Sequence, residues 1–280
     1  MEGFQNRKLL IATKHGKEQV IAPILEKNLG VICFTDNNID TDVLGTFSGE
    51  VERKKSPYKT ALEKCKMAMQ ITGCDLVLAS EGSFGAHPVA FFSQANEELV
   101  VLLDQKNNQD FFGKTLTTDT NFSGALISSK EEARIFANQI GFPEHALIIK
   151  DQEQEFKKLV KGICSPKALE KALDSMLKKE GTVWIETDMR AMYNPTRMRV
   201  IAQATDNLID RMKSVCPVCN HPGFWVVETL QGLPCSSCGL PTKSTKSHKY
   251  TCRNCQYTEN RDFPHGKKNE SPMFCNFCNP

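Results

Sequence analysis

Eight cysteines near the C-terminal end carry the clearest chemistry in this sequence. They form four Cys-x-x-Cys pairs: Cys216/Cys219, Cys235/Cys238, Cys252/Cys255 and Cys275/Cys278. Two intervening residues let a tight turn aim both sulfurs at one ion, and two such pairs supply the four thiolates of a tetrahedral zinc site. Because all eight positions are sulfur, no coordination site stays open for a substrate. The pattern predicts two structural zinc ions.

The spacing of the pairs also bears on which of them share an ion. Fifteen residues separate the first two pairs and nineteen separate the last two, and both gaps are typical of two-knuckle sites. We therefore expect tandem sites, with an interleaved arrangement as the alternative. Three histidines are less favoured substitutes for a cysteine ligand: His221, His248 and His265.

The remaining four cysteines are scattered among apolar neighbours. They are Cys33, Cys65, Cys74 and Cys164. Free cysteine is among the most buried residue types, so we expect inert buried thiols at these positions.

Charge is unevenly distributed along the chain. Residues 211–280 hold nine Lys and Arg against four Asp and Glu, a balance of +5, whereas the first 210 residues hold 26 against 29, a balance of −3. A basic tail suggests nucleic acid. However, a zinc ion held by four thiolates is a −2 centre, so two centres remove four of the five charges. The electrostatic case for nucleic acid is therefore weak.

Length and composition favour a two-domain protein. The chain has 280 residues, which is more than one compact core usually needs. We expect an α/β domain with a mixed sheet over residues 1–212 and a small zinc-ribbon-like domain over 213–280.

The longest apolar runs are too short for a membrane span, and the start of the sequence does not have the pattern of a signal peptide. The expected location is the cytoplasm.

The first domain shows alternating strand and helix patterns. Apolar runs predict strands over residues 8–13, 31–36, 75–80 and 97–104, with helices over 18–30 and 56–73. Ser56 with Pro57 is a typical helix start, Gly30 a typical helix end, and Pro23 is expected to kink or shorten the first helix. This order favours an α/β sheet.

The stretch between the second strand and the second helix is expected to be a loop or hairpin. It contains three carboxylates, Asp40, Asp42 and Glu50, and the two aspartates suit a metal by type.

The second part of this domain continues with charged helices. Residues 151–180 look helical throughout, with Ser165 and Pro166 as a start signal inside the stretch. A last strand over 182–190 ends in charge. Asn194 and Pro195 then start a long helix.

Charged side chains follow three of these strands. The first strand leads to Lys14, His15 and Lys17, the third stops at Glu81 with His87 nearby, and the last leads to Asp188, Arg190, Asn194 and Arg197. If these strands are parallel, their ends meet at one edge of the sheet, where α/β proteins bind ligands. Cations and carboxylates would then line a cleft suited to a metal–phosphate ligand. Alternatively, Arg190 and Arg197 pair with Glu186 and Asp188 in a structural network.

The sequence resembles two known families. GTFSGE, ASEGSFG, TDMRA–NPTRM and the final CNP are similar to an uncharacterised prokaryotic family, domain of unknown function 6671. Residues 8 to about 104 distantly resemble the inosine/xanthosine triphosphatase fold: ATKHGK stands for its AT-x-N-x-x-K phosphate loop, TALEKC for Gly-Ala-x-x-Arg-Ala, and the strand from Asp75 to Glu81-Gly82-Ser83 for one ending in Glu-Gly-Gly. That glutamate lies in the family's nucleotide and metal site, which implies the same role for Glu81.

Two functional hypotheses follow. In the first, the protein is a Mg²⁺-dependent hydrolase of a phosphorylated small molecule or nucleotide, with a structural zinc tail. Glu81 and Asp188 would then be catalytic, holding Mg²⁺ or activating water, and the anionic ligand would be bound by Lys14, His15, Lys17, Arg190, Asn194 and Arg197.

In the second hypothesis, the protein is not an enzyme. The zinc tail would contact protein or nucleic acid, and the α/β domain would be a scaffold or sensor. Five aromatic residues of the tail are candidates for base stacking or, more simply, for packing around the zinc sites: Phe224, Trp225, Tyr250, Tyr257 and Phe277.

Overall fold

The computed structural model describes residues 3–39, 56–90 and 92–280. The chain forms two compact units, Met1–Ile209 and Asp210–Pro280. Asp40, Asp42 and Glu50, the predicted loop carboxylates, lie outside the described residues. Among the helices that are described, each is too short or too polar to cross a bilayer.

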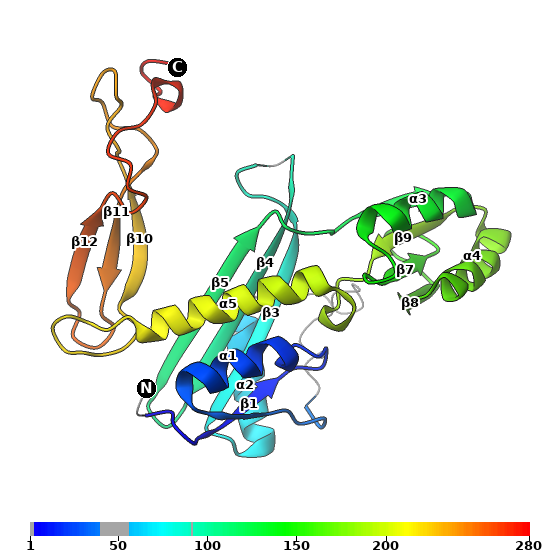
Figure 1. The fold of residues 1–280 in the computed structure, drawn as a ribbon, viewed down its shortest axis with the longest axis horizontal. Coiled ribbons are helices and arrows are strands. Elements are labelled where there is room, and N and C mark those ends of the chain that lie inside the picture. Colours follow the sequence, from blue (N-terminus) through cyan, green and yellow to red (C-terminus); the bar gives the residue numbers. More distant parts are fainter. Residues whose placement is uncertain (1–2, 40–55, 91) are drawn as a thin grey trace. The chain divides into compact units, whose positions relative to one another are not determined.

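The first unit contains a five-stranded mixed sheet in the order β2-β1-β3-β4-β5 (Figure 1). Its strands are β1 (Lys8–Ala12), β2 (Ile32–Phe34), β3 (Leu76–Ala86), β4 (Gln94–Asp104) and β5 (Gln109–Thr117). β1 is parallel to both β2 and β3, whereas β4 is antiparallel to β3 and β5. The predicted α/β mixed sheet is therefore confirmed.

Helices cover both faces of this sheet. α2 (Pro57–Thr72) packs Ala61, Cys65 and Ala68 against alternate residues of β1, β3 and β4. α1 (Glu18–Leu29) and the long α5 (Pro195–Lys213) lie against the other face (Figure 1). α1 continues through Pro23 and ends at Gly30, whose φ of 68° is the left-handed conformation typical of a helix end.

β3 is longer than the sequence suggested. It does not stop at Glu81 but continues to Ala86, paired with β4 along its whole length. The change of character at Glu81, which suggested the end of the strand, has a physical cause: β1 pairs with β3 only as far as Ala79. Glu81 therefore lies just beyond the end of β1, although β3 itself goes on.

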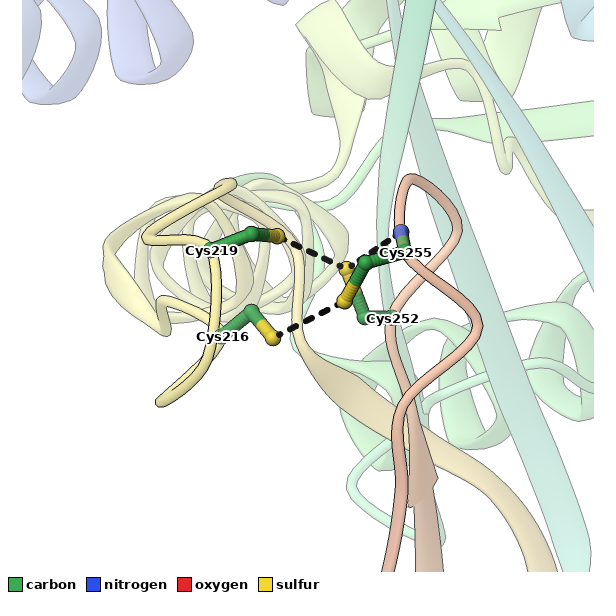
Figure 2. Close-up of side chains that lie close together, drawn as sticks. All are labelled: Cys216, Cys219, Cys252 and Cys255. Atoms are coloured by element: carbon green, nitrogen blue, oxygen red, sulfur yellow. Dashed lines mark hydrogen bonds between the residues drawn. The ribbon is translucent and has the colours of Figure 1, made fainter.

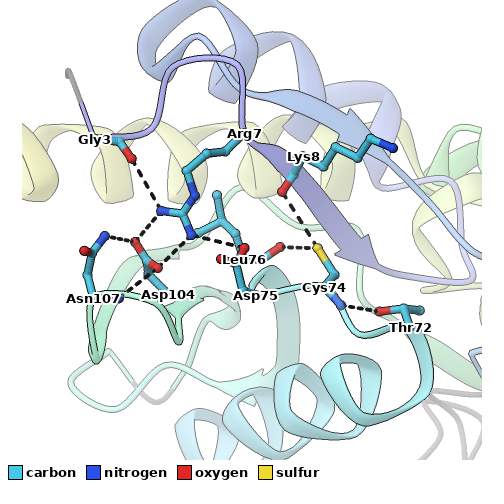
Figure 3. Close-up of polar contacts among 9 residues, drawn as sticks. All are labelled: Gly3, Arg7, Lys8, Thr72, Cys74, Asp75, Leu76, Asp104 and Asn107. Carbon is cyan, nitrogen blue, oxygen red and sulfur yellow. Dashed lines mark hydrogen bonds and ion pairs between the residues drawn. The ribbon is translucent and has the colours of Figure 1, made fainter.

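An arginine joins the start of β1 to the far end of the antiparallel strands (Figure 3). Arg7 donates to both carboxylate oxygens of Asp104, at 2.7 and 2.8 Å, and lies 3.2 Å from Asp75. The hydrogen bond to Asp104 is the main cause of a raised pKa of Arg7. Burial alone would raise the pKa of Asp104, but the hydrogen bonds from Arg7 and Asn107 outweigh it and lower that pKa. These contacts hold together the end of the sheet where β1 and β3 begin and β4 ends, and Glu81 lies toward the other end.

The first unit also contains a four-stranded antiparallel sheet in the order β6-β9-β7-β8. Its strands are β6 (Gly124–Ile127), β7 (Leu147–Lys150), β8 (Leu159–Ile163) and β9 (Val183–Thr187). α3 (Lys130–Ile140) and α4 (Pro166–Glu180) pack on the same face of it, around Leu147, Ile149 and Ile185. The expectation of helix throughout 151–180 is wrong for residues 151–165: residues 159–163 form β8, and the helix begins only at Pro166.

The second unit is built on a three-stranded antiparallel sheet, β10-β11-β12. Its strands are β10 (Trp225–Gln231), β11 (Thr245–Thr251) and β12 (Thr258–Asp262), and a short 3₁₀ turn follows at Pro272–Phe274. The four Cys-x-x-Cys pairs lie before, between and after these strands. The sheet therefore determines which pairs can meet.

Candidate functional site

The cysteines of the second unit form two clusters of four. One contains Cys216, Cys219, Cys252 and Cys255 (Figure 2), and the other contains Cys235, Cys238, Cys275 and Cys278. In each cluster the four sulfurs lie within 4.8 Å of one another. Each cluster could hold one metal ion, and donor sets of four thiolates are typical of zinc.

The sulfur spacing matches a tetrahedral site. Neighbouring sulfurs are 3.6 Å apart in the first cluster, and 3.7 and 3.9 Å apart in the second. A tetrahedron with metal–sulfur bonds of about 2.3 Å has edges of about 3.8 Å. A disulfide would need about 2.05 Å, so these cysteines are unbridged. The geometry fits a thiolate cage that could hold an ion.

The clusters are interleaved, so the expectation of tandem sites is wrong. The first pair joins the third, and the second joins the fourth. The three-stranded meander gives the reason. The first pair precedes β10 and the third lies between β11 and β12, at the same end of the sheet; the second lies between β10 and β11 and the fourth follows β12, at the opposite end. Residue spacing carries no information about this.

One turn geometry recurs in all four pairs. The N–H four residues after the first cysteine donates to that cysteine's carbonyl oxygen, at 2.8 to 3.0 Å, from Asn220, Gly239, Gln256 and Asn279. The first three of these residues have φ between 56° and 74°. Asparagine and glycine are the residues that most readily adopt this left-handed conformation. The turn brings both sulfurs of a pair to one side.

Two thiols of the first cluster have pKa values shifted in opposite directions. The backbone N–H of His221 is the main cause of a lowered pKa of Cys219, about 6. The N–H of Tyr257 would lower the pKa of Cys255, but burial and the neighbouring sulfurs, those of Cys219 and Cys216 foremost, raise it to about 12. Four thiolates cannot all ionise side by side without a positive charge between them.

Aromatic packing supports the first cluster. Phe224 is buried beside Cys216 and Cys252, and its ring lies 5.6 Å from Tyr250 and 5.9 Å from Tyr257. These three residues, considered above for base stacking, thus pack around the cluster. The other two aromatic candidates, Trp225 and Phe277, are not part of this hydrophobic cluster, and Phe277 is 73% exposed. The three histidines that were weighed as ligands lie outside both clusters.

A buried glutamate organises the second cluster. Glu270 bridges to Cys235 through its backbone, and its carboxylate accepts from Ser244 Oγ at 2.6 Å and from Ser271 N at 2.7 Å. Its ion pair with Lys267 is the main cause of a lowered pKa, about 2. Glu270 therefore ties the fourth cysteine pair to the second.

In the first unit, a buried ionic network lies beyond the end of β1. Lys17 Nζ donates to Ser80 Oγ at 2.9 Å, and both residues are buried. Burial, and after it the charge of Arg197, lowers the pKa of Lys17 to about 7. Arg197 is fully buried and donates to Glu98 through Nε at 2.7 Å. A Cβ on Gly82 would lie 2.5 Å from Glu98 Oε1, so only glycine fits beneath this pair.

Glu81 faces the opposite side of β3, toward α2. It is 2% exposed and forms an ion pair with Lys64. Its charge and that of Lys64 still act on Lys17. The five charged groups therefore form one network of three cations (Lys17, Lys64, Arg197) and two carboxylates (Glu81, Glu98).

The other predicted site residues occupy different surroundings. Asp188 is fully buried and accepts from Arg190 Nε at 3.0 Å and Nη2 at 2.6 Å, and from the Gly162 N–H at 3.0 Å. Asn194 Oδ1 accepts from the Arg197 N–H at 2.9 Å, which caps α5. Lys14 is exposed and His15 half-buried in the loop after β1. His87 accepts from the N–H groups of Val89 and Ala90.

The convergence expected at one edge of a sheet holds only in part. β1 and β3 are parallel neighbours, and Lys17 and Arg197 lie near their ends on one face of β3, with Glu81 on the opposite face. β9 belongs to the other sheet and is antiparallel to its neighbours. Asp188 and Arg190, which follow it, pair with each other, while the carbonyl oxygen of Met189 between them accepts from Arg197. The arginines pair with carboxylates as the structural alternative supposed, although Arg197 takes Glu98 rather than Glu186 or Asp188.

Sequence reasoning missed several members of the network. Ser80, Lys64 and Glu98 were not singled out, and neither was Asn96, which is fully buried with no hydrogen-bond partner for its amide among the described residues. The available signal was Asn96 and Glu98 at alternate positions, just before the apolar run Leu99–Leu103 of the same strand. Alternation places both on one face of β4, where a buried polar group needs a partner.

Comparison with known proteins identifies the family. The family model DUF6671, a domain of unknown function, matches residues 64–280, and the chain belongs to this family. No curated protein matches the chain. Among solved structures, the crystal structure of protein VC0702 from Vibrio cholerae is similar at a TM-score of 0.33 and 9% identity, over 73% of this chain and 94% of that one. A similarity this distant does not identify a function.

Proposed function

We propose that the second unit binds two zinc ions as structural centres. The observation that carries the proposal is the pair of interleaved four-sulfur clusters, whose spacing matches the edges of a zinc–thiolate tetrahedron. With four protein ligands each, neither centre has an open position for substrate.

Metal content and coordination test this directly. The full chain, purified without added metal, should contain two zinc ions, and X-ray absorption should show four sulfur neighbours at about 2.3 Å. Nitrogen or oxygen in the average ligand shell, or a content of one ion, would contradict the proposal.

For the first unit, we propose binding and hydrolysis of a phosphorylated small molecule or nucleotide at the Lys17 network. The observation in favour is the charge balance: three buried cations face two carboxylates, and the only hydrogen bond of the Lys17 ammonium among the described residues is to a neutral hydroxyl. A buried cation without a full complement of acceptors suits an anion. Glu81 would hold Mg²⁺ or activate water.

Nucleotide turnover tests this second proposal. The zinc-loaded chain should release phosphate or pyrophosphate from a member of a nucleotide panel with Mg²⁺, and Glu81→Gln should abolish that release. Glu131→Gln, an exposed site on α3, is the control and should retain activity. Absence of release by the wild-type chain would refute hydrolysis and favour the alternative, an α/β scaffold or sensor whose zinc tail contacts protein or nucleic acid.

A further inference from the structure

A cavity of about 380 Å³ lies on the four-stranded sheet, next to Arg197 of the Lys17 network, whose guanidinium lies 5.2 Å from the centre of the Phe84 ring in the cavity lining. This volume falls within the range of small-molecule sites. α3 and α4 cover one face of the sheet around Ile149 and Ile185, and the cavity lies on the other, where Lys150 and Glu186 contribute to its lining.

The cations of this cavity are already neutralised by the protein. Lys150 Nζ lies 2.7 Å from Glu186 Oε1. Arg190 forms a forked pair with Asp188, which also accepts from two backbone N–H groups. Because each cation has its own carboxylate, the cavity offers no surplus positive charge to an anionic ligand.

Two further carboxylates give the cavity a negative balance. Glu153 and Glu155 line it and are exposed, and neither forms an ion pair in the described part of the chain. Together with the paired groups, the lining holds two cations and four carboxylates, a formal charge of −2. This balance favours a positively charged ligand.

Aromatic rings supply the rest of the recognition surface. Phe84, Phe122 and Phe156 line the cavity, and the rings of Phe84 and Phe122 lie 5.6 Å apart. The faces of aromatic rings attract cations, most strongly where water is excluded. Lys150 Nζ, 4.8 Å from the centre of the Phe156 ring, shows that this arrangement already occurs at the site.

We propose that this cavity binds a small organic cation, an alkylated amine or quaternary ammonium, with its carbon groups against the phenyl rings and its charge near Glu153 and Glu155. The neutralised cations, the surplus carboxylates and the three rings are separate observations that agree on this class of ligand. The proposal goes beyond both proposed functions, since it involves neither the cysteine clusters nor Lys17 and Glu81; it meets the Lys17 network at Phe84, over whose ring Arg197 lies.

A charged ligand and its neutral isostere provide the test. Choline and 3,3-dimethylbutan-1-ol have the same shape and differ in the central charge. Titration calorimetry on the full zinc-loaded chain should show choline binding at least about tenfold tighter than the alcohol, since charge–ring and charge–carboxylate attraction act on choline alone. Added sodium chloride should weaken choline binding.

Matched variants locate the site. Glu153→Gln with Glu155→Gln should weaken choline binding by about tenfold, the loss expected for two partly exposed charge contacts. Glu131→Gln with Glu144→Gln, which removes two exposed carboxylates outside the cavity, should leave binding unchanged. Equal affinity for choline and the alcohol, no choline binding up to about 50 mM, or equal losses in both double variants would overturn the proposal.

Discussion

At the scale of the single residue, the burial of Lys17 lowers the stability of the protein. It is 6% exposed, and its ammonium has a hydroxyl rather than a carboxylate as its hydrogen-bond acceptor. Burial lowers its pKa to about 7 in the folded chain, whereas an unfolded lysine titrates near 10.4. Between these two values the unfolded state holds more protons, so the free energy of unfolding rises as the pH rises from about 7 to 10.4.

Replacing Lys17 should therefore stabilise the protein. We expect Lys17→Met to raise the free energy of unfolding at pH 7 by up to about 4 kcal/mol, the value of a shift of some three pKa units, and to abolish the rise of stability between pH 7 and 10. Denaturant unfolding with zinc present, at several pH values, measures both. Anion binding at the network should be lost, as when a strained functional residue is removed.

The control for this prediction is Lys66→Met on the exposed side of α2. It should leave both the stability at pH 7 and the pH slope within about 0.5 kcal/mol of the wild type. If Lys17→Met instead destabilises the chain at pH 7 and keeps the slope, the lysine is a stabilising group and its burial needs another explanation.

Residue types and spacing predicted which side chains carry chemistry, but not which side chains far away in the sequence they contact. The cysteine ligands follow from Cys-x-x-Cys spacing alone, because the two sulfurs of a pair are brought together by four consecutive residues. Lys17 was singled out as an anion-binding residue by its place after a strand, and that role stays a prediction. Its contact with Ser80 spans 63 positions, and that of Arg197 with Glu98 spans 99. Such contacts depend on how strands and helices stack, which local patterns do not encode.

At the scale of the element, α5 lies so close to β5 that one glycine is indispensable. A Cβ on Gly113 would overlap the backbone of α5, at the carbonyl oxygen of Ala204 and the nitrogen of Leu208. Because backbone atoms within a helix cannot move aside as a flexible side chain can, the helix would have to lift from the sheet.

We expect Gly113→Ala to lower the free energy of unfolding by about 3 kcal/mol or more, the upper range for overpacking. Denaturant unfolding of the full chain measures it. Gly3→Ala is the matched substitution, since an added Cβ there meets no atom within 4 Å, and it should change stability by less than about 0.5 kcal/mol. A loss below about 1 kcal/mol at Gly113 would mean that the helix and strand are not in direct contact.

Helix ends were the most predictable elements. Ser165 accepts from the Ala168 N–H and Asn194 from the Arg197 N–H, as their positions before a proline suggested. Residues 159–163 were wrongly predicted as helix because their sequence, LVKGI, lies between charged segments and shows no clear hydrophobic period of its own. It forms a strand by pairing with β7, so its conformation comes from a neighbour rather than from propensity.

At the scale of the whole molecule, we expect the second unit to depend on metal binding at its two cysteine clusters. Its buried hydrophobic cluster consists of Phe224 with Cys216 and Cys252, together with a few half-buried neighbours. A core this small does not fold a unit of about 70 residues by burial alone, so we expect metal binding to supply folding free energy. The family shown by residues 64–280 has no assigned activity, which leaves the two clusters as its clearest chemical feature.

The interleaved arrangement of the four cysteine pairs is a property of the whole unit, and the spacing of the pairs along the sequence predicted it incorrectly. Spacing describes single turns, whereas the partnership of the turns is set by the direction of three strands between them. Two fourfold variants separate the alternatives. One replaces Cys216, Cys219, Cys252 and Cys255 by serine, and the other replaces Cys216, Cys219, Cys235 and Cys238.

Native mass spectrometry of these two variants is the most direct test. The interleaved arrangement predicts that the first variant retains one zinc ion, held by Cys235, Cys238, Cys275 and Cys278, and that the second retains none. One zinc ion in the second variant and none in the first would contradict the account, because that result requires tandem sites.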